Sequence, residues 1–393
     1  MSLTKKQEEG LKIARQRYNL KERYTTIAGL AGSGKTYLSH MLLDALGIKE
    51  GEYLVGAYTG KAALRLQENG FPQAKTLHKL FYKSVKVPGS DDFIHIPLDK
   101  SLFSQFKLVI IDEVSMVPDS MLRVIAKTGL HVINIGDPEQ LPPIGTDNGM
   151  LASPHIFLDE VVRQAEGNSI IRLAHAIRNR EPIEPFCDEN VQMVPKEELS
   201  TGMLLWADQI LCGKNATRHE LNRIVREELG HTGNMPVVGD KIILTRNNWE
   251  FVNADGNPII NGLIGNITKV SEPIRDPRGN IINQASVYGY MNFMPDFSTA
   301  EFKNVKFDAL PFLTGETSYV FDQNAKGAEK INTVDFGFAI TTHKSQGSEY
   351  SKVLGVEERL NGKNHRKWLY TMVTRASEKL VLVYDKNSGI WEK

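Results

Sequence analysis

Gly29-Leu30-Ala31-Gly32-Ser33-Gly34-Lys35-Thr36 is the stretch that decides the fold of this chain. It fits the pattern of a glycine, four residues and then Gly-Lys-Ser/Thr, which builds a loop around nucleotide phosphates. Residues 24–28 before it are typical of a buried strand, and residues 35–46 after it carry leucines at helical spacing. A strand, this loop and a helix together predict an α/β domain that binds a nucleotide.

The loop residues have distinct expected roles. Glycines let the backbone turn its N–H groups toward phosphate oxygens, and the following helix N-terminus adds positive potential. Lys35 is expected to reach the β- and γ-phosphates of ATP, and the Thr36 hydroxyl is expected to be a ligand of Mg²⁺. The complete set of expected ATP-binding residues in this loop is Gly29, Gly32, Ser33, Gly34, Lys35 and Thr36.

Two later strands end in polar residues. The apolar run 108–111 is followed by Asp112 and Glu113, and the run 131–135 is followed by a Gly-Asp-Pro-Glu-Gln segment that contains Gln140. Strand ends of an open α/β sheet line its ligand crevice. We therefore expect Asp112 to hold Mg²⁺, Glu113 to position or deprotonate the attacking water, and Gln140 to sense the γ-phosphate.

Composition restricts the class of protein. The chain has 393 residues, 41% hydrophobic and 24% charged, which is typical of a soluble globular protein of two or three domains. Its net charge is zero, so contact with nucleic acid requires a local basic surface. The two cysteines, Cys187 and Cys212, argue against a disulfide framework or a zinc site and favour a reducing compartment. Neither a membrane span nor a signal peptide is expected.

The pattern changes along the chain. A second α/β region is expected to begin with a helix at 168–178 and a strand at 209–212, and Thr217 to Glu220 has the spacing of a capping box that opens another helix. From about 238 to 332, short β-type runs alternate with turn dipeptides, which predicts an all-β insertion. The run 379–384 is expected to be a final strand.

A basic stretch offers a candidate nucleic-acid surface. Residues 61–86 contain six basic side chains and one acid, Glu68, with Phe71, Phe81 and Tyr82 interleaved. Cations along a backbone and aromatic faces for stacking suit single-stranded nucleic acid, whereas a solvated helix face with core aromatics is the alternative. Between Phe81 and Leu98 the sequence predicts a two-stranded excursion that turns at residues 88–91.

Several ordered segments resemble superfamily 1 DNA helicases of the RecD-like and phage Dda-like branch. Glu113 is followed by Val-Ser-Met, and the Gly-Asp-x-x-Gln-Leu-Pro-Pro segment lies at 136–143. Further matching segments are Tyr58-Thr59-Gly60-Lys61-Ala62-Ala63, Thr76-Leu77-His78, Val162-Arg163-Gln164, Gly239-Asp240-Lys241, residues 341–349 (TTHKSQGSE) and residues 369–376 (LYTMVTRA). Tyr58 departs from the family, which usually carries proline before the threonine.

The resemblance implies roles for residues outside the phosphate loop. Gln7 would read adenine, Arg163 and Arg375 would stabilise charge at the γ-phosphate, Gln346 would contact that phosphate and Glu349 the ribose. Implied DNA contacts are Thr59, Lys61, Thr76, His78, Pro142, Thr341 and His343. The hairpin would split the duplex, with Phe93 or His95 near its tip.

The fold class that this resemblance implies is α/β, with two RecA-like P-loop domains, a β-hairpin insertion in the first and an SH3-like all-β insertion in the second. The first domain would span residues 1–160 with the hairpin at about 82–98, the second 161–238 plus 333–393, and the inserted β domain 239–332. Because the chain starts about 28 residues before its phosphate loop and ends soon after Arg375, we expect a compact stand-alone motor.

The expected function is that of an ATP- and Mg²⁺-dependent DNA helicase that moves on single-stranded DNA from 5′ to 3′ in replication, recombination or repair. Expected partners are single-stranded DNA, single-/double-strand junctions and a single-strand-binding or replisome protein. The chain is expected to act as a monomer in a bacterial cytoplasm, or in the host cytoplasm if phage-encoded. The alternatives are an RNA helicase, a small-molecule P-loop kinase and a non-catalytic DNA-binding or scaffold subunit.

Overall fold

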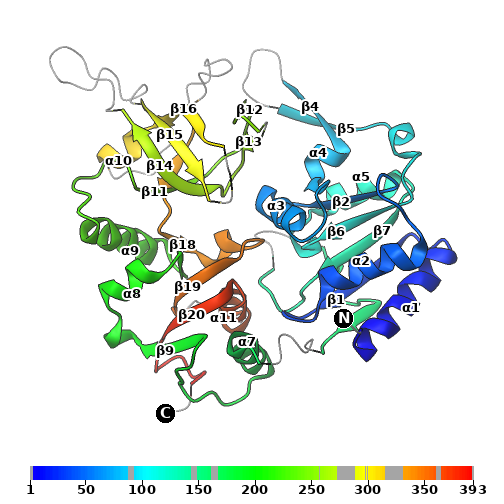
Figure 1. Cartoon of the computed structure of the whole chain (residues 1–393), viewed down its shortest axis with the longest axis horizontal. Coiled ribbons are helices and arrows are strands. Elements are labelled where there is room, and N and C mark those ends of the chain that lie inside the picture. Colours follow the sequence, from blue (N-terminus) through cyan, green and yellow to red (C-terminus); the bar gives the residue numbers. More distant parts are fainter. Residues whose placement is uncertain are drawn as a thin grey trace. The chain divides into compact units, whose positions relative to one another are not determined.

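The computed structural model describes residues 3–86, 93–142, 148–160, 167–255, 257–271, 288–296, 298, 300–314, 331–359 and 364–391. The chain divides into two compact units, whose elements are drawn in Figure 1. Unit 1 comprises Met1–Val85, His95–Glu198 and Ser345–Lys393, and unit 2 comprises Lys86–Ile94 and Leu199–Lys344. Among the described residues, no helix combines the length and hydropathy that crossing a membrane requires.

A six-stranded parallel sheet organises the first half of unit 1. Its strand order is β3-β2-β6-β7-β1-β8, and every neighbouring pair is parallel. The strands are β1 (Tyr24–Gly29), β2 (Tyr53–Ala57), β3 (Lys75–Thr76), β6 (Leu108–Asp112), β7 (His131–Gly136) and β8 (Ile156–Leu158). The predicted strands before the phosphate loop and before the acidic pair are therefore confirmed, and they lie in one sheet.

Helices precede or follow these parallel strands in the chain. They are α1 (Lys5–Asn19), α2 (Lys35–Leu46), α3 (Gly60–Glu68), α4 (Leu77–Phe81) and α5 (Asp119–Lys127). Helix α2 starts at the lysine of the phosphate loop, as predicted, and α1 packs against α2, β1 and β8. Two 3₁₀ turns, Lys100–Phe103 and Val114–Met116, flank β6.

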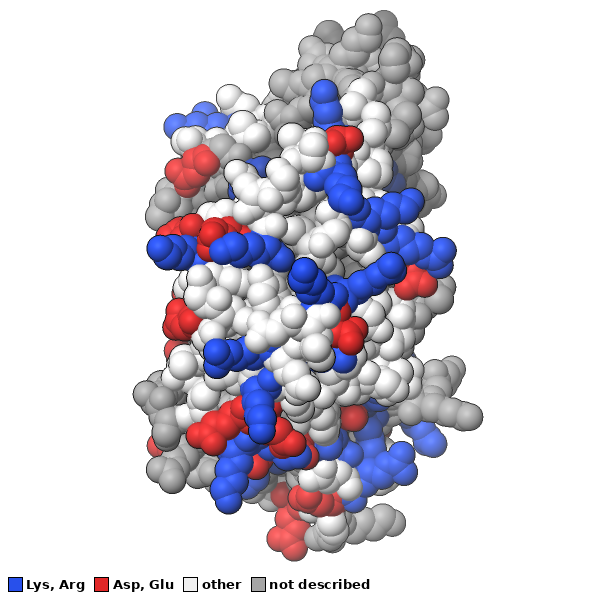
Figure 2. All heavy atoms as spheres, turned by 90° about the vertical axis from the view of Figure 1, so that its right-hand side faces the viewer, with Lys and Arg blue, Asp and Glu red and all other residues white. Residues whose placement is uncertain are grey.

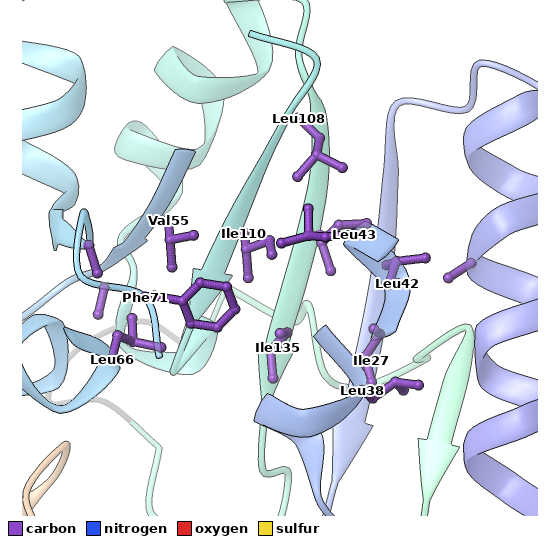
Figure 3. Close-up of a cluster of buried hydrophobic side chains, with 14 of the residues drawn as sticks. Ile27, Leu38, Leu42, Leu43, Val55, Leu66, Phe71, Leu108, Ile110 and Ile135 are labelled. Atoms are coloured by element: carbon purple, nitrogen blue, oxygen red, sulfur yellow. The ribbon is translucent and has the colours of Figure 1, made fainter. Parts of the chain in front are cut away.

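The sheet carries a hydrophobic core on each face, as expected for parallel strands covered by helices. Successive residues of β6 alternate between the two: Leu108 and Ile110 belong to one cluster, and Val109 and Ile111 to the other. Figure 3 shows the first cluster, in which strand side chains meet the leucines of α2 and the Phe71 ring. This packing fixes the ends of β1 and β6, from which the candidate site is built.

The basic stretch contains core residues. Phe71 and Phe81 are each 1% exposed, so these two rings pack in the core and do not form a stacking surface for bases. The excursion is confirmed as a two-stranded ribbon of β4 (Tyr82–Lys86) and β5 (Phe93–Pro97). Its predicted turn at 88–91 lies outside the described residues.

The second α/β region contributes elements to both units. In unit 1, β19 (Tyr350–Val356), β20 (Ala376–Tyr384) and β9 (Val191–Pro195) pair in parallel, beside helices α7 (Ser169–Asn179) and α11 (His365–Val373). In unit 2, β10 (Gln209–Cys212) pairs in parallel with β18 (Ala339–Thr341), and the helices are α8 (Thr201–Trp206) and α9 (Asn215–Glu228). The predicted final strand is confirmed and begins three residues earlier than expected.

The predicted start of α9 is wrong. Thr217 was expected to cap the helix, but α9 begins at Asn215 and Thr217 lies in its first turn. A tertiary interaction explains the difference. Arg218 donates to the Asp335 carboxylate at 2.5 Å and to the Asn215 side chain at 3.3 Å, which fixes this turn as helix.

Unit 2 also contains an antiparallel sheet of order β16-β15-β14-β11-β17. Its strands are β11 (Lys241–Leu244), β14 (Ile264–Val270), β15 (Tyr288–Pro295), β16 (Phe302–Asp308) and β17 (Val334–Phe336), accompanied by the pair β12 (Asn248–Val252) and β13 (Pro258–Ile259) and by α10 (Leu310–Thr314). The predicted β-rich character of the insertion is confirmed for its described residues, but the all-β prediction is wrong at α10, and the SH3-like topology stays a prediction.

Candidate functional site

The phosphate loop has the backbone that its glycines allow. Gly32 and Gly34 have φ values of 75° and 73°, in the left-handed region that glycine adopts without steric cost. A Cβ atom at Gly29 would lie 2.6 Å from Ser33 Oγ, so only glycine lets the loop close over β1. Ser33 Oγ donates to the Leu30 carbonyl at 2.8 Å and fixes the turn.

The loop ends in a cationic helix start. Gly34 is the N-cap of α2, and Lys35 Nζ donates to the carbonyls of Gly29 at 2.8 Å and Leu30 at 3.0 Å. The amino group is therefore held over the loop, next to the N-terminal N–H groups of α2. A helix N-terminus and an ammonium group in one place favour a polyanion such as a triphosphate.

Gln7 is attached to the same loop. This residue is 2% exposed, and its Nε2 donates to the Ser33 carbonyl at 3.0 Å. Its Oε1 accepts from Thr4 N at 3.0 Å, which completes a capping box at the start of α1. Gln7 thus links the first helix to the phosphate loop, and its role in reading adenine stays a prediction.

The acidic pair ends β6 beside the loop. Burial, and next the neighbouring Glu113 carboxylate, raise the pKa of Asp112 to about 6, although Arg65 and Lys35 act in the opposite direction. Glu113 has a φ of 49°, a left-handed conformation that costs an ordinary residue about 1–2 kcal/mol. Strain and a buried charge are both unfavourable for folding, so their coincidence here supports a functional site.

The acidic pair and the loop fit a magnesium ion. Asp112 supplies a carboxylate whose charge is poorly compensated by the protein, and Thr36, in the first turn of α2, supplies a hydroxyl. Oxygen donors of this kind are what Mg²⁺ prefers, and it keeps several water ligands, so two protein ligands suffice. A bound Mg²⁺ would neutralise phosphate charge and position the phosphoryl group.

The segment after β7 reaches the same place. Asp137 is 2% exposed, and its carboxylate accepts from Glu139 N at 2.9 Å. Burial is the largest cause of its raised pKa, and Lys35 acts against that rise. Gln140 follows in a partly exposed turn, and Pro142 is half-buried at the end of the described part of this segment.

Residues from the C-terminal motifs lie beside these elements within unit 1. Arg375 is 2% exposed, and its guanidinium donates to the carbonyls of Thr371 at 3.2 Å and Ser348 at 3.0 Å. Burial lowers its pKa, whereas the carboxylates of Glu113, Glu349 and Asp137 raise it. A buried arginine among acids at a phosphate loop has the charge that a developing phosphoryl anion requires.

Two further expected ATP contacts have protein partners. Gln346 Nε2 donates to the Leu141 carbonyl at 2.8 Å, and the Glu349 carboxylate pairs with Arg65. Arg65 is therefore a site residue that the sequence reasoning missed, although it belongs to the basic stretch. Arg163 lies outside the described residues.

Tyr370 was also missed. Its hydroxyl donates to Asp137 Oδ2 at 2.7 Å and accepts from the N–H of Ala31 in the phosphate loop at 3.0 Å. Tyr370 lies in the segment 369–376 that resembles the family, but that resemblance implied a role for Arg375 alone. Neither contact is visible in the sequence, because 339 residues separate Tyr370 from Ala31.

The candidate DNA residues divide into those of unit 1 and those of unit 2. Thr59 and Thr76 are helix N-caps whose hydroxyls accept from Ala62 N at 3.2 Å and Lys79 N at 3.3 Å. An accepting hydroxyl still has its proton to donate, so capping is compatible with a phosphate contact. Lys61 lies in the first turn of α3. Thr341 and His343 belong to unit 2, where burial lowers the pKa of His343.

His78 packs at the base of the hairpin. Its ring lies 5.1 Å from the ring of His95 and 5.6 Å from that of Tyr82, measured between centroids. Burial first, and then His95, lower the pKa of His78, so the imidazole is mainly neutral at pH 7. His95 thus contacts α4 and β4, and the side chain of Phe93 lies outside the described residues.

Figure 2 shows one face of the molecule, on which lysine and arginine side chains are interspersed with acidic ones. The face in this view is therefore neither purely basic nor purely acidic. The contact with nucleic acid that the sequence predicts would therefore depend on the local arrangement of basic side chains.

Comparisons with known proteins agree with this geometry. Residues 2–193 match the AAA domain family, and residues 336–383 match the UvrD-like helicase C-terminal domain family. The ATP-dependent RecD2 DNA helicase of Deinococcus radiodurans is 28% identical over 390 residues, which cover 91% of this chain and 46% of the relative. The ATP-dependent DNA helicase dda of Enterobacteria phage T4 is 23% identical over 282 residues, which cover 65% of this chain and 64% of the relative.

Solved structures show the same fold. A Pif1 helicase from Bacteroides in complex with ADP-AlF3 and ssDNA aligns over 100% of this chain and 95% of that chain, with a TM-score of 0.56 and 20% identity. The Pif1 helicase from Candida albicans aligns with a TM-score of 0.54 and 18% identity over 100% of this chain and 97% of that one. These likenesses confirm the two-domain RecA-like α/β fold. In its ordered motifs, its site geometry and these relatives, the chain resembles superfamily 1 helicases of the RecD-like and Dda-like branch.

Proposed function

We propose that the chain is an ATP- and Mg²⁺-dependent DNA helicase that moves on single-stranded DNA in the 5′ to 3′ direction. The observation that carries this proposal is the assembly, within unit 1, of the phosphate loop, the acidic pair and the buried Arg375. The relatives named as DNA helicases supply the substrate class. The direction rests on resemblance to the RecD-like and Dda-like branch.

The positions of the described side chains support the proposed chemistry. Lys35 and the N–H groups at the start of α2 would hold the phosphates, and Thr36 and Asp112 would hold Mg²⁺. Glu113 would position or deprotonate the attacking water, Gln140 would sense the γ-phosphate, and Arg375 would stabilise the charge that develops on it. Arg163 is proposed to share that last role.

Nucleic acid is proposed to contact residues of both units. The proposed contacts in unit 1 are Thr59, Lys61, Thr76, His78 and Pro142, and those in unit 2 are Thr341 and His343.

We propose domains at 1–160, 161–238 plus 333–393, and 239–332, and an SH3-like topology for the last. The protein is proposed to act as a monomer at single-/double-strand junctions in the cytoplasm. Its proposed partner is a single-strand-binding or replisome protein, and its proposed process is replication, recombination or repair.

The test measures strand separation on two duplexes, one with a 5′ single-stranded tail and one with a 3′ tail. The wild type is expected to unwind only the 5′-tailed duplex, and only with ATP and Mg²⁺. Lys35→Ala is expected to lower unwinding and ATP hydrolysis by at least about 10²-fold and to keep measurable DNA binding. Lys49→Ala, an exposed lysine beyond α2, is the matched control and should behave as wild type.

Each alternative outcome has a distinct meaning. Unwinding by Lys35→Ala at the wild-type rate would refute the proposed ATP site. Unwinding from the 3′ tail would keep the motor and reverse the proposed direction. Stimulation of ATP hydrolysis by an RNA oligonucleotide, and not by the matched DNA, would replace the DNA helicase with an RNA helicase.

A further inference from the structure

Helix α11 is attached to the segment after β7 by one face. Lys367 Nζ donates to the Pro138 carbonyl at 2.7 Å, and the Thr371 hydroxyl accepts from Leu141 N at 2.8 Å. The Tyr370 hydroxyl, on the same helix, donates to Asp137 Oδ2 at 2.7 Å. The three α11 side chains stand at positions i, i+3 and i+4, which share one face of a helix.

Tyr370 alone among these three side chains also reaches the phosphate loop. Its hydroxyl accepts the Ala31 N–H, and His175 of α7 contacts the carbonyl of the same Ala31 at 3.3 Å. The hydroxyl is buried and uses both its donor and an acceptor position on groups that belong to two different loops. Removing it leaves a partly buried N–H and a buried carboxylate oxygen without this partner.

The attachment of α11 determines where Arg375 lies. The Arg375 Nε donates to the carbonyl of Thr371, one turn earlier, and Thr371 is itself held by Leu141. A rotation or slide of α11 would therefore move the Arg375 guanidinium away from Glu113 and Asp137, with whose carboxylates it interacts electrostatically. The register of α11 against the phosphate loop is thus set by the contacts of Tyr370 and Thr371.

We propose that Tyr370 is a positioning residue for ATP hydrolysis: its hydroxyl locks α11 to the phosphate loop at Ala31 and to Asp137, and so places Arg375 at the reacting phosphate. The inference rests on the proposed ATPase function and adds to it a residue that never touches the nucleotide. It assigns Tyr370 a role in the transition state and not in ground-state affinity.

The test compares Tyr370→Phe with wild type in steady-state ATP hydrolysis. The variant is expected to lose about 10-fold in kcat while its KM for ATP stays within about 2-fold, because a misplaced Arg375 costs transition-state stabilisation alone. Correspondingly, affinity for ADP should be unchanged and affinity for ADP with aluminium fluoride, a transition-state mimic, should fall about 10-fold.

Matched variants separate positioning from folding. Tyr384→Phe removes the hydroxyl of another buried tyrosine in the same unit, whose ring lies next to that of Trp391, and should match the wild type. Thr371→Val removes the neighbouring contact to Leu141 and should show the same split between kcat and KM as Tyr370→Phe. It serves as the main variant if Tyr370→Phe does not give a cooperative thermal transition.

The outcomes distinguish this inference from the proposed function. Wild-type kcat in Tyr370→Phe, or a parallel fall in affinity for ADP and for its aluminium fluoride complex, would overturn the inference and leave the helicase assignment intact. A wild type without any ATP hydrolysis would overturn the proposed function, and this inference with it.

Discussion

The carboxylate of Asp112 lies where burial disfavours its charged form. Its pKa is raised from 3.8 to about 6, first by burial and then by Glu113. A carboxyl group whose pKa rises on folding stabilises the fold below its unfolded pKa, and this contribution is lost as the pH rises through about 6. Two pKa units correspond to at most about 3 kcal/mol. Above pH 6 the residue therefore favours function at the expense of stability.

Replacing this carboxylate is expected to stabilise the protein. In metal-free buffer, Asp112→Asn should raise the free energy of unfolding by about 1–3 kcal/mol at pH 8 and by much less at pH 4. Urea denaturation at both pH values measures the change. The exposed Asp44→Asn in α2 is the control and should change neither value. Equal stability of Asp112→Asn and wild type at pH 8 would contradict the raised pKa.

At the scale of elements, the turn around Gly347 meets the start of α3 inside unit 1. Gly347 has a φ of 75°, and a Cβ there would lie 3.1 Å from Thr59 Oγ1 and 3.2 Å from Ala62 Cβ. Gly389 has nearly the same φ, 76°, with nothing within 4 Å of its Cβ position. The two glycines thus share a backbone conformation and differ in crowding.

This pair yields a prediction about the contact between two elements. Gly389→Ala should lower the free energy of unfolding by about 1 kcal/mol, the cost of the left-handed backbone. Gly347→Ala should lower it by about 2–3 kcal/mol, since the Thr59 cap and α3 must also move. Denaturant melts measure both, and single-strand affinity should fall only in Gly347→Ala. Identical losses in the two variants would show that the Thr59 contact is unimportant.

Sequence patterns predicted elements better than they predicted contacts between elements. The strand, loop and helix at Lys35 were predicted because hydrophobic periodicity and the glycine pattern are local. The start of α9 was predicted wrongly because the distant Asp335 holds Arg218 in its first turn. Likewise, Phe81 was ambiguous as a stacking ring until its burial was known. Tyr370 carries no local signal, since both of its partners lie in distant segments.

At the scale of the whole molecule, the two units are supported by separate interactions. In unit 2, the buried Arg226 of α9 donates to Asp240 at 2.9 Å and to the carbonyls of Gly233 and Met235 at 2.8 Å each, and it lies 4.1 Å above the Phe336 ring. This network joins α9 to the start of the antiparallel sheet. The described residues of the candidate ATP site all belong to unit 1.

Breaking the network should therefore loosen unit 2 and leave nucleotide binding intact. Arg226→Met removes the arginine from the Asp240 carboxylate, which is 0% exposed and keeps the His231 ring and the Val237 N–H as partners, and should cost about 3 kcal/mol. Arg223→Ala, three residues earlier in α9 and paired with Glu220 and Glu227 in solvent, is the matched control and should leave exchange in β11 and β17 unchanged. Because two units need not unfold together, hydrogen–deuterium exchange resolved by peptide is the appropriate measurement.

Arg226→Met should accelerate exchange in β11 and β17, leave exchange in β1 and β6 unchanged, and retain wild-type affinity for ADP. Faster exchange in β1 and β6 as well would mean that the two units unfold as one.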